Sequence, residues 1–443
     1  MMRGRTEPAG SMGFRFGFGS VIIGEIWLEG WFIGMAFSTT RRSFLKSTAL
    51  ASFAGAAGAN LVGQPATALA AGDPKVLGEA GVKSAQRPKG VWQVVSDRKI
   101  RVGIVGYGVC QFGAQFGFQD HPNVSVVAVS DLFKDRCDNL ARACRCGKTY
   151  PSLEELVKDD SIEAVFVATD APHHVEHCIE VLKHGKHVAS AVPAVFGSLE
   201  DAERLYQAVK AGGRHYMMFE TSAFRGDCCA MRLAYRAGAF GKLIYSEGEY
   251  FHYMATPIDS YKGWRIGLPP QFYPTHSNAY QLCVTGGSFT EVSCLAMPSI
   301  LPAFAAGANA YQNRFATEIA LFRTSEGGMS RMAVSWDTQG PENEVGRVRG
   351  ERGAMWTGRY EGAEKNLPDL SCPPLPPSVQ PGGHGGSHGH LMNEFVTAIL
   401  QNRQPLVDVS LALNLSVAGI VAHHSALKDG ELMKIPQYLP VGV

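Results

Sequence analysis

The sequence predicts an α/β protein, with a doubly wound parallel sheet in its N-terminal half and a mainly antiparallel sheet in its C-terminal half. From residue 100 to 219, short apolar runs alternate with helical patterns, which is typical of parallel strands joined by crossover helices. After residue 222, longer runs alternate polar and apolar residues and are separated by turns, as in antiparallel strands with one covered face. We therefore expect one domain over 99–221 and another over 222–443.

The elements of the first half follow in a regular order. We expect strands at 100–105, 124–130, 164–169, 185–190 and 215–219, and helices from about 174 to 184 and from about 199 to 211. The second half is expected to hold strands at 243–250, 315–322 and 329–336, then a proline- and glycine-rich loop at 372–389 and helices at 391–401 and 411–427. No internal repeat is evident.

Charge and cysteine content exclude several classes of protein. The 443 residues include 41 Lys and Arg against 40 Asp and Glu, so the net charge of +1 gives no support to nucleic-acid binding. Ten cysteines without a CxxC pair are too few for a disulfide scaffold, and buried thiols are expected instead of a metal or redox site. The histidines of 384–390 lack nearby carboxylate or cysteine ligands, so no metal site is predicted.

The first 71 residues are expected to be a targeting region. The segment 40–46, Thr-Arg-Arg-Ser-Phe-Leu-Lys, matches the twin-arginine export pattern, a mild apolar stretch follows, and 68–70 offers a small-x-small cleavage site. The apolar run 20–37 carries two glutamates, which argues against a permanent membrane anchor, and Met35 is a plausible true start. We expect a periplasmic or otherwise exported protein, a partner in the twin-arginine machinery, and a linker at 72–98.

A glycine-rich turn predicts a dinucleotide site. Gly106 and Gly108 follow the first strand directly, and Asp131 ends the second strand, 131 − 106 = 25 residues after the first glycine. Gly106 allows the tight turn, Gly108 lets the backbone approach a pyrophosphate, and Asp131 accepts hydrogen bonds from the adenosine ribose. Gln111 stands where the third glycine of the pattern is expected, which predicts looser packing of helix against strand. The Asp131 carboxylate favours NAD over NADP, although Lys134 follows it closely.

The order of motifs over about 99–440 resembles the Gfo/Idh/MocA oxidoreductases. The matching pieces are the glycine turn, the 168–174 turn, 185–188, the loop at Pro193, and 291–293 downstream of His276. The resemblance implies an N-terminal Rossmann domain and a C-terminal domain whose large open sheet forms a sugar or polyol site and the contact of a dimer or tetramer. The predicted export route, which carries folded proteins, indicates that the NAD is tightly bound. The loop 382–386 is also similar to the NAD-dependent glycosidases of this superfamily.

Two positions depart from the family pattern. Where the family carries Glu-Lys-Pro, this chain has Ala-Val-Pro at 191–193, so Val192 replaces the lysine that polarises the sugar hydroxyl. Where the family carries Asp-x-x-x-His, Phe272 replaces the aspartate and His276 remains. We expect His276 to be the base, helped by Tyr273 or Tyr280 if the pKa of either is lowered.

The remaining candidates follow from strand ends and from the resemblance. The expected cofactor-binding residues are Gly106, Tyr107, Gly108, Val109, Cys110, Asp131, Thr169, His174, Val192 and Pro193. The expected substrate-binding residues are Glu220, Trp264, Arg265 and His384. Trp264 offers a face on which a sugar ring stacks.

Three functions stay open on the sequence. The first is an exported oxidoreductase that moves a hydride between bound NAD(H) and a sugar or polyol. The second is a glycoside hydrolase or other sugar-modifying enzyme that uses bound NAD without net redox change. The third, motivated by Val192 and Phe272, is a nucleotide- and sugar-binding protein without catalysis.

Overall fold

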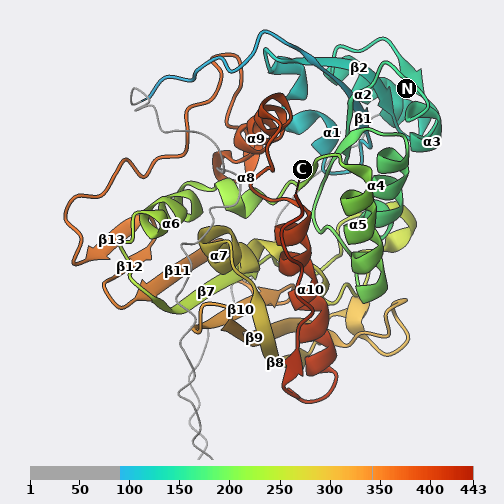
Figure 1. Cartoon of the computed structure of the whole chain (residues 1–443). Helices are drawn as coiled ribbons and strands as arrows, with labels where there is room; N and C mark the ends of the chain where they lie inside the picture. The colour runs from blue at the N-terminus through green and yellow to red at the C-terminus, as the bar shows by residue number, and fades with distance from the viewer. Residues whose placement is uncertain (1–89, 342, 443) are drawn as a thin grey trace, which may run out of the picture. The chain divides into compact units, whose positions relative to one another are not determined.

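Two sheets organise the part of the chain that the computed structural model describes, residues 90–341 and 343–442 (Figure 1). Both sheets belong to one compact unit of the chain. The expected boundary at 221/222 therefore stays a prediction. The predicted targeting region 1–71 and most of the linker lie outside the described residues.

The first sheet is parallel throughout and has the strand order β3-β2-β1-β4-β5-β6. Its strands are β1 (Ile100–Val105), β2 (Val124–Ser130), β3 (Thr149–Tyr150), β4 (Ala164–Val167), β5 (His187–Ser190) and β6 (Tyr216–Met218). This order is that of a Rossmann fold, and the strand order reverses between β1 and β4, where such folds bind their ligand. The predicted doubly wound parallel sheet is confirmed.

Helices join the parallel strands. They are α1 (Phe112–Gln115), η1 (Phe118–Asp120), α2 (Lys134–Ala143), α3 (Leu153–Leu156), η2 (Ala171–His173), α4 (His174–Lys183), α5 (Leu199–Gly212) and η3 (Thr221–Phe224). The expected helix near 199–211 is present as α5, which begins because Ser198 Oγ accepts the Asp201 amide at 3.1 Å and ends at Gly213, whose φ of 58° suits a C-terminal cap.

The second sheet has the order β13-β12-β11-β7-β10-β9-β8-β14. Its strands are β7 (Leu243–Phe251), β8 (Phe289–Pro298), β9 (Phe315–Thr324), β10 (Met329–Ser335), β11 (Asn343–Gly350), β12 (Gly353–Trp356), β13 (Arg359–Gly362) and β14 (Met433–Lys434). All neighbouring pairs are antiparallel except β7 and β10, which run parallel. The predicted large, mainly antiparallel sheet is confirmed.

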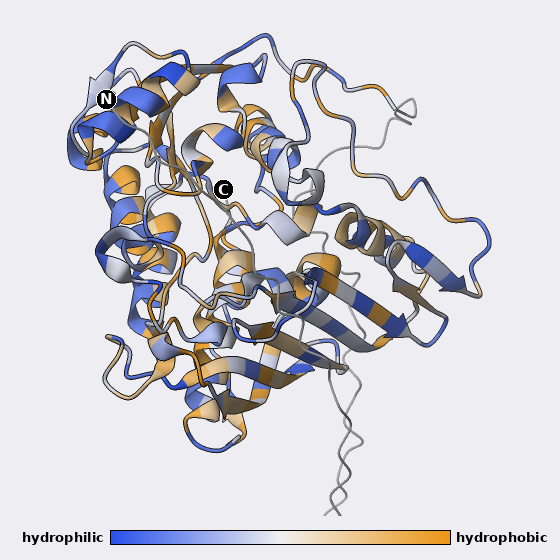
Figure 2. Cartoon of the chain, turned by 180° about the vertical axis from the view of Figure 1, so that it is seen from behind, coloured by the Kyte–Doolittle hydropathy of each residue, from blue (hydrophilic) through white to orange (hydrophobic). Residues whose placement is uncertain are grey.

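Alternation along the strands shows which face of this sheet is covered. In β9 every second residue from Ala316 to Thr324 is buried, while Ile319 and Leu321 on the other face are exposed. Bands of polar and apolar residues alternate along the strands in Figure 2. Helices α7 (Thr275–Thr285) and α10 (Val409–Ala426) pack on the buried face.

The other helices of this half are α6 (Gly226–Arg236), η4 (Tyr261–Gly263), η5 (Pro270–Phe272), η6 (Pro302–Phe304), α8 (Gly383–Gly386) and α9 (His388–Gln401). Sequence patterns did not predict α6, α7, β8 or β11 to β13. In α7 this has a clear cause: the residues from Thr275 to Val284 are all buried, so the helix has no polar stripe to give a 3.6-residue period. It lies directly on β7, where a Cβ at Gly248 would come within 2.0 Å of the Ser277 carbonyl oxygen.

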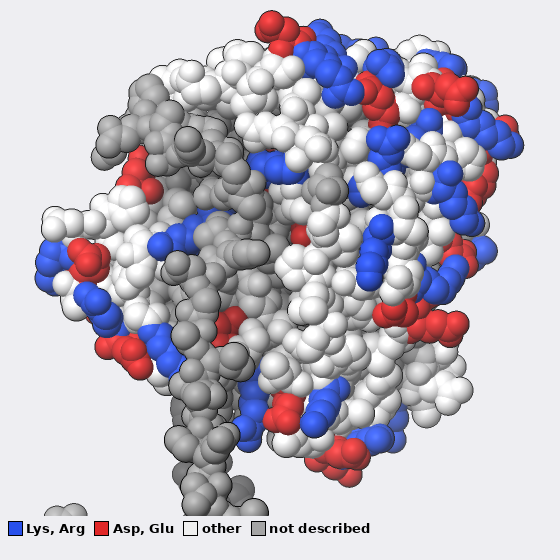
Figure 3. All heavy atoms as spheres, in the orientation of Figure 1, with Lys and Arg blue, Asp and Glu red and all other residues white. Residues whose placement is uncertain are grey.

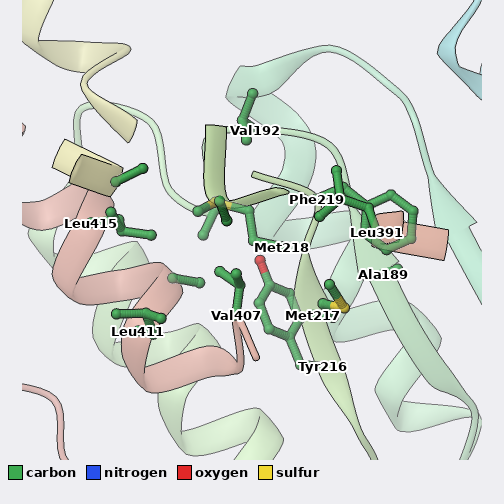
Figure 4. Close-up of a cluster of buried hydrophobic side chains, with 14 of the residues drawn as sticks. Ala189, Val192, Tyr216, Met217, Met218, Phe219, Leu391, Val407, Leu411 and Leu415 are labelled. Atoms are coloured by element: carbon green, nitrogen blue, oxygen red, sulfur yellow. The ribbon is translucent and has the colours of Figure 1, made fainter. Parts of the chain in front are cut away.

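The core is continuous between the two sheets. Figure 4 shows Tyr216 and Met218 of β6 on the side of the strand that faces Leu411 and Leu415 of α10, with Met217 on the other side. The Met218 amide donates to the Val407 carbonyl oxygen at 3.0 Å, which ties the edge of the parallel sheet to the segment before α10. Helix α10 is long and apolar enough to cross a membrane, but 89% of it is buried in the protein, as in a core helix. Charges of both signs are mixed over the face in Figure 3.

Candidate active site

A cavity of about 430 Å³ lies at the carboxyl ends of the parallel strands. Its lining residues fall in 105–112, 130–136, 152–154, 168–171 and 191–192, which follow β1, β2, β3, β4 and β5. Residues of 259–265 and Tyr273, from the second half of the chain, line it as well. The cavity is therefore bounded by loops of the nucleotide-binding type on one side and by the second half on the other.

The glycine turn fits the role predicted for it. Gly106 has φ of 102°, and a Cβ there would come within 2.3 Å of the Ala168 carbonyl oxygen. A Cβ at Gly108 would meet nothing within 4 Å, so the backbone there is open to the cavity. A Cβ at Gly113 would lie 2.3 Å from the Gly106 carbonyl oxygen. Gly113 thus supplies the close contact that Gln111 was expected to loosen, and the prediction of looser packing is wrong.

Asp131 closes this turn. Its Oδ2 accepts the Tyr107 amide at 2.7 Å, and its Oδ1 accepts the Phe133 amide at 2.9 Å. Each carboxylate oxygen keeps a further lone pair, so the group can still accept ribose hydroxyls while it holds the loop. Helix α1 has only four residues, and its dipole contributes less at this site than that of a longer helix would.

Seven of the ten expected cofactor residues line the cavity: Gly106, Gly108, Val109, Cys110, Asp131, Thr169 and Val192. Tyr107, His174 and Pro193 do not line it. His174 is instead buried beneath the loops, with Nδ1 at 2.8 Å from the Pro193 carbonyl oxygen and Nε2 at 3.2 Å from that of Thr169. Burial lowers the pKa of His174, against the effect of the two carbonyl contacts. The neutral ring has one N–H and can donate to only one of the two carbonyl oxygens at a time.

An aromatic and cationic group faces the cavity from the second half. The Arg265 guanidinium carbon lies 4.3 Å from the centre of the Trp264 ring and 5.8 Å from that of Tyr273. The rings of Trp264 and Tyr273 are stacked, 6.4 Å apart. A flat aromatic surface beside a guanidinium suits a sugar, whose ring stacks and whose hydroxyls accept hydrogen bonds. These three residues are those that the sequence analysis placed at the substrate and the reacting hydroxyl.

His276 forms a buried pair with Glu220 behind Tyr273. His276 Nδ1 lies 2.8 Å from Glu220 Oε1, which also accepts the Ser222 amide at 2.8 Å. The Tyr250 and Tyr273 rings pack on the imidazole at 4.6 and 5.7 Å between ring centres. Glu220, expected to bind substrate, does not line the cavity but is fully buried against the histidine.

A second carboxylate, that of Glu344, adds a negative charge near His276. The partly buried Glu344 accepts a hydrogen bond from Ser222 Oγ at 3.0 Å, and Arg225 lies 3.6 Å from it. Burial lowers the pKa of His276, but the charges of Glu220 and Glu344 outweigh burial and raise the pKa to about 9. At neutral pH His276 is therefore an imidazolium held by two carboxylates. In this state His276 can donate a proton to a substrate. It can act as a base only after the imidazolium has lost its proton.

The two tyrosines do not meet the condition set for a base. Burial raises the pKa of Tyr273 to about 12, although Arg265 acts against this. Burial and then Asp227 raise the pKa of Tyr280 well above its usual range. Tyr280 Oη lies 3.2 Å from Asp227 Oδ2 and donates to the Glu344 carbonyl oxygen at 2.8 Å, and Tyr280 does not line the cavity. Both tyrosines are hydroxyl donors near neutral pH.

His384 lies beside the cavity and does not line it. Its Nδ1 is 2.8 Å from His388 Nε2, and its ring packs on Phe112, which does line the cavity. Burial lowers the pKa of both histidines, to about 4 for His388, so the pair shares one hydrogen bond between neutral rings. Within the described residues, no group of three His, Cys, Asp or Glu side chains could hold a metal ion.

The two positions that depart from the family pattern are apolar for different reasons. Val192 lines the cavity, where it adds an apolar wall. Phe272 packs in an aromatic cluster with Phe196, Tyr311 and His423, and lies against Gly197, where a Cβ would be 2.6 Å from its ring. Position 272 therefore belongs to the core here.

Several lining residues had no predicted role, among them Phe133, Ser152, Glu154 and Asp259. Ser152 and Glu154 follow β3, which has only two residues and gives no apolar run to recognise. Asp259 lies in a segment with no strand, and only its closeness to Trp264 in the sequence could have pointed to it.

The fold and the cavity define a nucleotide-binding α/β protein of the Rossmann type with a second, sheet-based half. Residues 100–220 match the family model described as oxidoreductase family, NAD-binding Rossmann fold, of the Gfo/Idh/MocA type. This match, with the relatives and solved structures described next, supports a member of the Gfo/Idh/MocA family, as the sequence motifs predicted.

Similar curated proteins carry the name glycosyl hydrolase family 109 protein. One from Bacteroides thetaiotaomicron is 29% identical over 163 residues, 34% of this chain and 34% of that protein. The chain thus matches about a third of that relative's length. One from Akkermansia muciniphila is 29% identical over 63% of each chain, and one from Streptomyces niveus is 24% identical over 76% of this chain and 77% of that one.

Solved structures share the fold. A levoglucosan dehydrogenase in complex with NADH and levoglucosan has a TM-score of 0.62 and 16% identity, covering 77% of this chain and all of that one. Myo-inositol 2-dehydrogenase from Lactobacillus plantarum has a TM-score of 0.59 and 17% identity, covering 76% of this chain and all of that one. Both have the two-part architecture described above.

Proposed function

We propose that this protein is an enzyme that holds NAD(H) tightly and transfers a hydride between it and a ring carbon of a sugar or polyol. The observation that carries the proposal is the shared cavity. Its one wall is the glycine turn with Asp131, and its other wall is Trp264, Arg265 and Tyr273. One cavity thus offers a nucleotide cradle and a sugar-like surface together.

The residues present fit the dinucleotide. Gly106 and Gly108 leave the backbone of the turn open to a pyrophosphate, and Asp131 faces the place of the adenosine ribose. Val192 would border the nicotinamide end, because it follows β5 and lines the same cavity. The cofactor, when bound, accepts or donates the hydride. We favour NAD over NADP because the Asp131 carboxylate repels a 2′-phosphate.

The chain's own residues would manage the proton. His276 is the group whose protonation can change, and Glu220 and Glu344 set its pKa. Oxidation of a hydroxyl requires the neutral imidazole, and reduction of a ketone requires the imidazolium. Tyr273, between His276 and the cavity, can hold a substrate oxygen as a donor. Arg265 and Trp264 orient the ring.

A second net reaction is supported by the sequence relatives. The glycosyl hydrolase family 109 proteins match this chain at higher identity than the dehydrogenase structures do. In this case the same hydride step would be followed by elimination across the sugar ring and reversed at the end, so NAD would be recycled. His276 as an imidazolium at neutral pH suits the proton return that such a cycle needs.

The first experiment identifies the bound nucleotide. The full chain is purified and denatured, and any released nucleotide is identified by chromatography and by its nicotinamide absorbance. Stoichiometric NAD(H) supports both net reactions. Aryl glycosides then separate them: aryl alcohol released without added NAD supports glycoside cleavage, whereas turnover that requires added NAD supports a dehydrogenase. If no nucleotide is released and none binds on addition, both fail and a protein without this chemistry remains.

We also propose that the open face of the second sheet joins copies of this chain into a dimer or tetramer. This face exposes Leu295, Met297, Ile319, Leu321 and Met329, a contiguous apolar group on β8, β9 and β10. Leu321→Glu should lower the mass measured by light scattering to that of a smaller species. Leu427→Glu, at an exposed leucine after α10, should leave it unchanged.

Export by the twin-arginine route is proposed from residues 40–46 and 68–70. Replacing Arg41 and Arg42 with lysine should keep the protein in the cytoplasm of a host that has this route. Equal amounts of the wild type and the variant outside the cytoplasm would contradict the assignment.

A further inference from the structure

Two cysteines that are distant in the sequence meet beside α6. Cys229 belongs to α6, and Cys372 belongs to the loop between β13 and α8. Their thiols interact as hydrogen-bond partners, and Cys372 Sγ also donates to the Phe224 carbonyl oxygen at 3.5 Å. Both are free thiols in this structure. The proposed hydride chemistry uses neither of them.

Only one of the two sulfurs faces open space. Cys372 is half-buried and lines an open pocket of about 520 Å³ together with Phe224, Ala230 and His390. Cys229 is 1% exposed. A reagent from solvent therefore reaches Cys372 first, with Cys229 behind it as the nearest second thiol.

The surroundings favour a thiolate at this place. The guanidinium of the buried Arg232 lies near both sulfurs and donates to the Ala223 carbonyl oxygen at 2.6 Å. The Cys372 hydrogen bond, with the charges of Arg232 and Arg236, lowers the pKa of Cys229 to about 7 against the effect of burial. The same contact raises the pKa of Cys372. The first proton lost by this hydrogen-bonded pair therefore leaves near neutral pH, which supplies the thiolate that disulfide exchange needs.

We propose that Cys229 and Cys372 are a site of reversible disulfide formation whose oxidant is a small-molecule disulfide of the glutathione type. In the first step a bond forms between Cys372 Sγ and one sulfur of the oxidant, and its other sulfur leaves as a thiolate. In the second step Cys229 Sγ bonds to Cys372 Sγ and displaces the second thiolate. The two protein thiols lose two electrons and two protons, and the oxidant becomes two thiols.

The bond would join two segments that flank the candidate active site. Helix α6 follows η3, which begins directly after Glu220, and the loop of Cys372 leads to α8 with His384. Oxidation would fix this loop to α6 and restrict the unfolded chain over a long loop, so the oxidised protein should be the more stable form. The inference does not depend on the proposed hydride chemistry.

The test uses the full reduced chain incubated with oxidised glutathione. Free thiols are counted after denaturation, and a digest without reductant is mapped by mass spectrometry. We expect the loss of two of the ten thiols and a single cross-linked peptide pair that contains Cys229 and Cys372. The melting temperature should rise by about 3 °C or more and return on addition of dithiothreitol. An unchanged thiol count, or a link between other cysteines, would overturn the proposal.

Three variants test the order of the two steps. Cys229→Ser should retain one glutathione on Cys372, because the displacing thiol is gone. Cys372→Ser should leave Cys229 reduced, because Cys229 is buried. Cys228→Ser is the matched control, since Cys228 Sγ faces the Ala279 carbonyl oxygen at 3.7 Å, and it should form the link as the wild type does. A glutathione adduct on Cys229 in Cys372→Ser would contradict the stated order. The mapped link in the wild type still decides the proposal if a variant fails to fold.

Discussion

The two walls of the cavity differ in the atoms that form them: one consists mainly of backbone, and the other depends on buried side chains. The wall that follows β1 and β2 is backbone: a glycine turn, a second close glycine contact and a carboxylate that accepts two amides. The wall that comes from the second half rests on buried side chains, with His276 hydrogen-bonded to Glu220 and also influenced by the charge of Glu344. The turn and its carboxylate lie within residues 106–133, whereas the second wall joins residues 56 or more positions apart. The comparison shows that residues close in the sequence can set the shape of a backbone turn, whereas the pKa of a buried histidine depends on residues from distant segments.

The largest expected effect lies in the wall of buried charges. His276→Ala should lower the rate of hydride transfer about 10²- to 10⁴-fold, because the proton then has no partner. The measurement is the change in nicotinamide absorbance after mixing with a sugar that is active on the wild type. Tyr280→Phe is the control and should stay within a few-fold of the wild type, since its hydroxyl is held by Asp227 and the Glu344 carbonyl oxygen and its pKa lies well above its usual range. An equal loss of hydride-transfer rate in the two variants would mean that the pair of His276 and Glu220 has a structural role only.

Substitutions at two glycines of the backbone wall should separate an effect on stability from an effect on NAD binding. Gly106→Ala should lower the unfolding free energy by about 3 kcal/mol or more, because its Cβ meets the Ala168 carbonyl oxygen and its φ is positive. Gly108→Ala should leave stability unchanged but weaken NAD binding about tenfold or more, since its Cβ fills only open space. Urea unfolding and nucleotide titration measure the two effects. Unchanged NAD affinity in Gly108→Ala would place the pyrophosphate elsewhere.

The charge wall also predicts a pH dependence. If His276 is the base, kcat/KM for oxidation should rise with pH and level off near pH 9, where the imidazolium loses its proton. Glu220→Gln removes one charge that raises this pKa, so the plateau should begin about one pH unit lower or more. Profiles of both proteins at constant ionic strength check this. A rate that falls with pH in the wild type would instead assign His276 the role of acid.

The smallest expected effect concerns the choice of cofactor. Asp131→Asn keeps an oxygen acceptor for the loop but removes the charge, so NAD should bind about tenfold less tightly and NADP less unfavourably than before. Calorimetric titration with both cofactors gives the ratio. Asp135→Asn, at an exposed position in α2 outside the cavity, is the control and should change neither affinity. An unchanged ratio in Asp131→Asn would remove the ribose role.

Much of the first half could be predicted because its signals are local. Buried parallel strands are apolar runs, and the glycine turn and Asp131 follow from spacing alone. The sequence failed to predict a very short strand and a close glycine contact that has moved from its usual position. The two-residue β3 gave no pattern, and Gly113 took over the close contact that the usual spacing assigns to position 111.

The candidate site in the second half was predicted only as a set of residue types. Of the expected substrate and catalytic residues, Trp264, Arg265 and Tyr273 line the cavity, whereas His276, Tyr280, Glu220 and His384 do not. Helix α7, which carries Tyr280 and His276, is buried on all sides and has no amphipathic period. No sequence pattern relates Glu220 to His276, because their contact depends on how α7 packs against the segment before η3.

The sequence by itself determined the fold class, the glycine turn with the Asp131 carboxylate that accepts its amide, and the resemblance to the family whose model matches residues 100–220. Each depends on interactions between neighbours along the chain or on a regular hydrophobic period. Only the tertiary structure decided that Glu220 and Glu344 hold His276 as a cation, that Phe272 belongs to the core, and that Cys229 meets Cys372. The physical reason is that pKa values and thiol contacts are set by burial and by charges brought together from distant segments, and these exist only after the chain has folded.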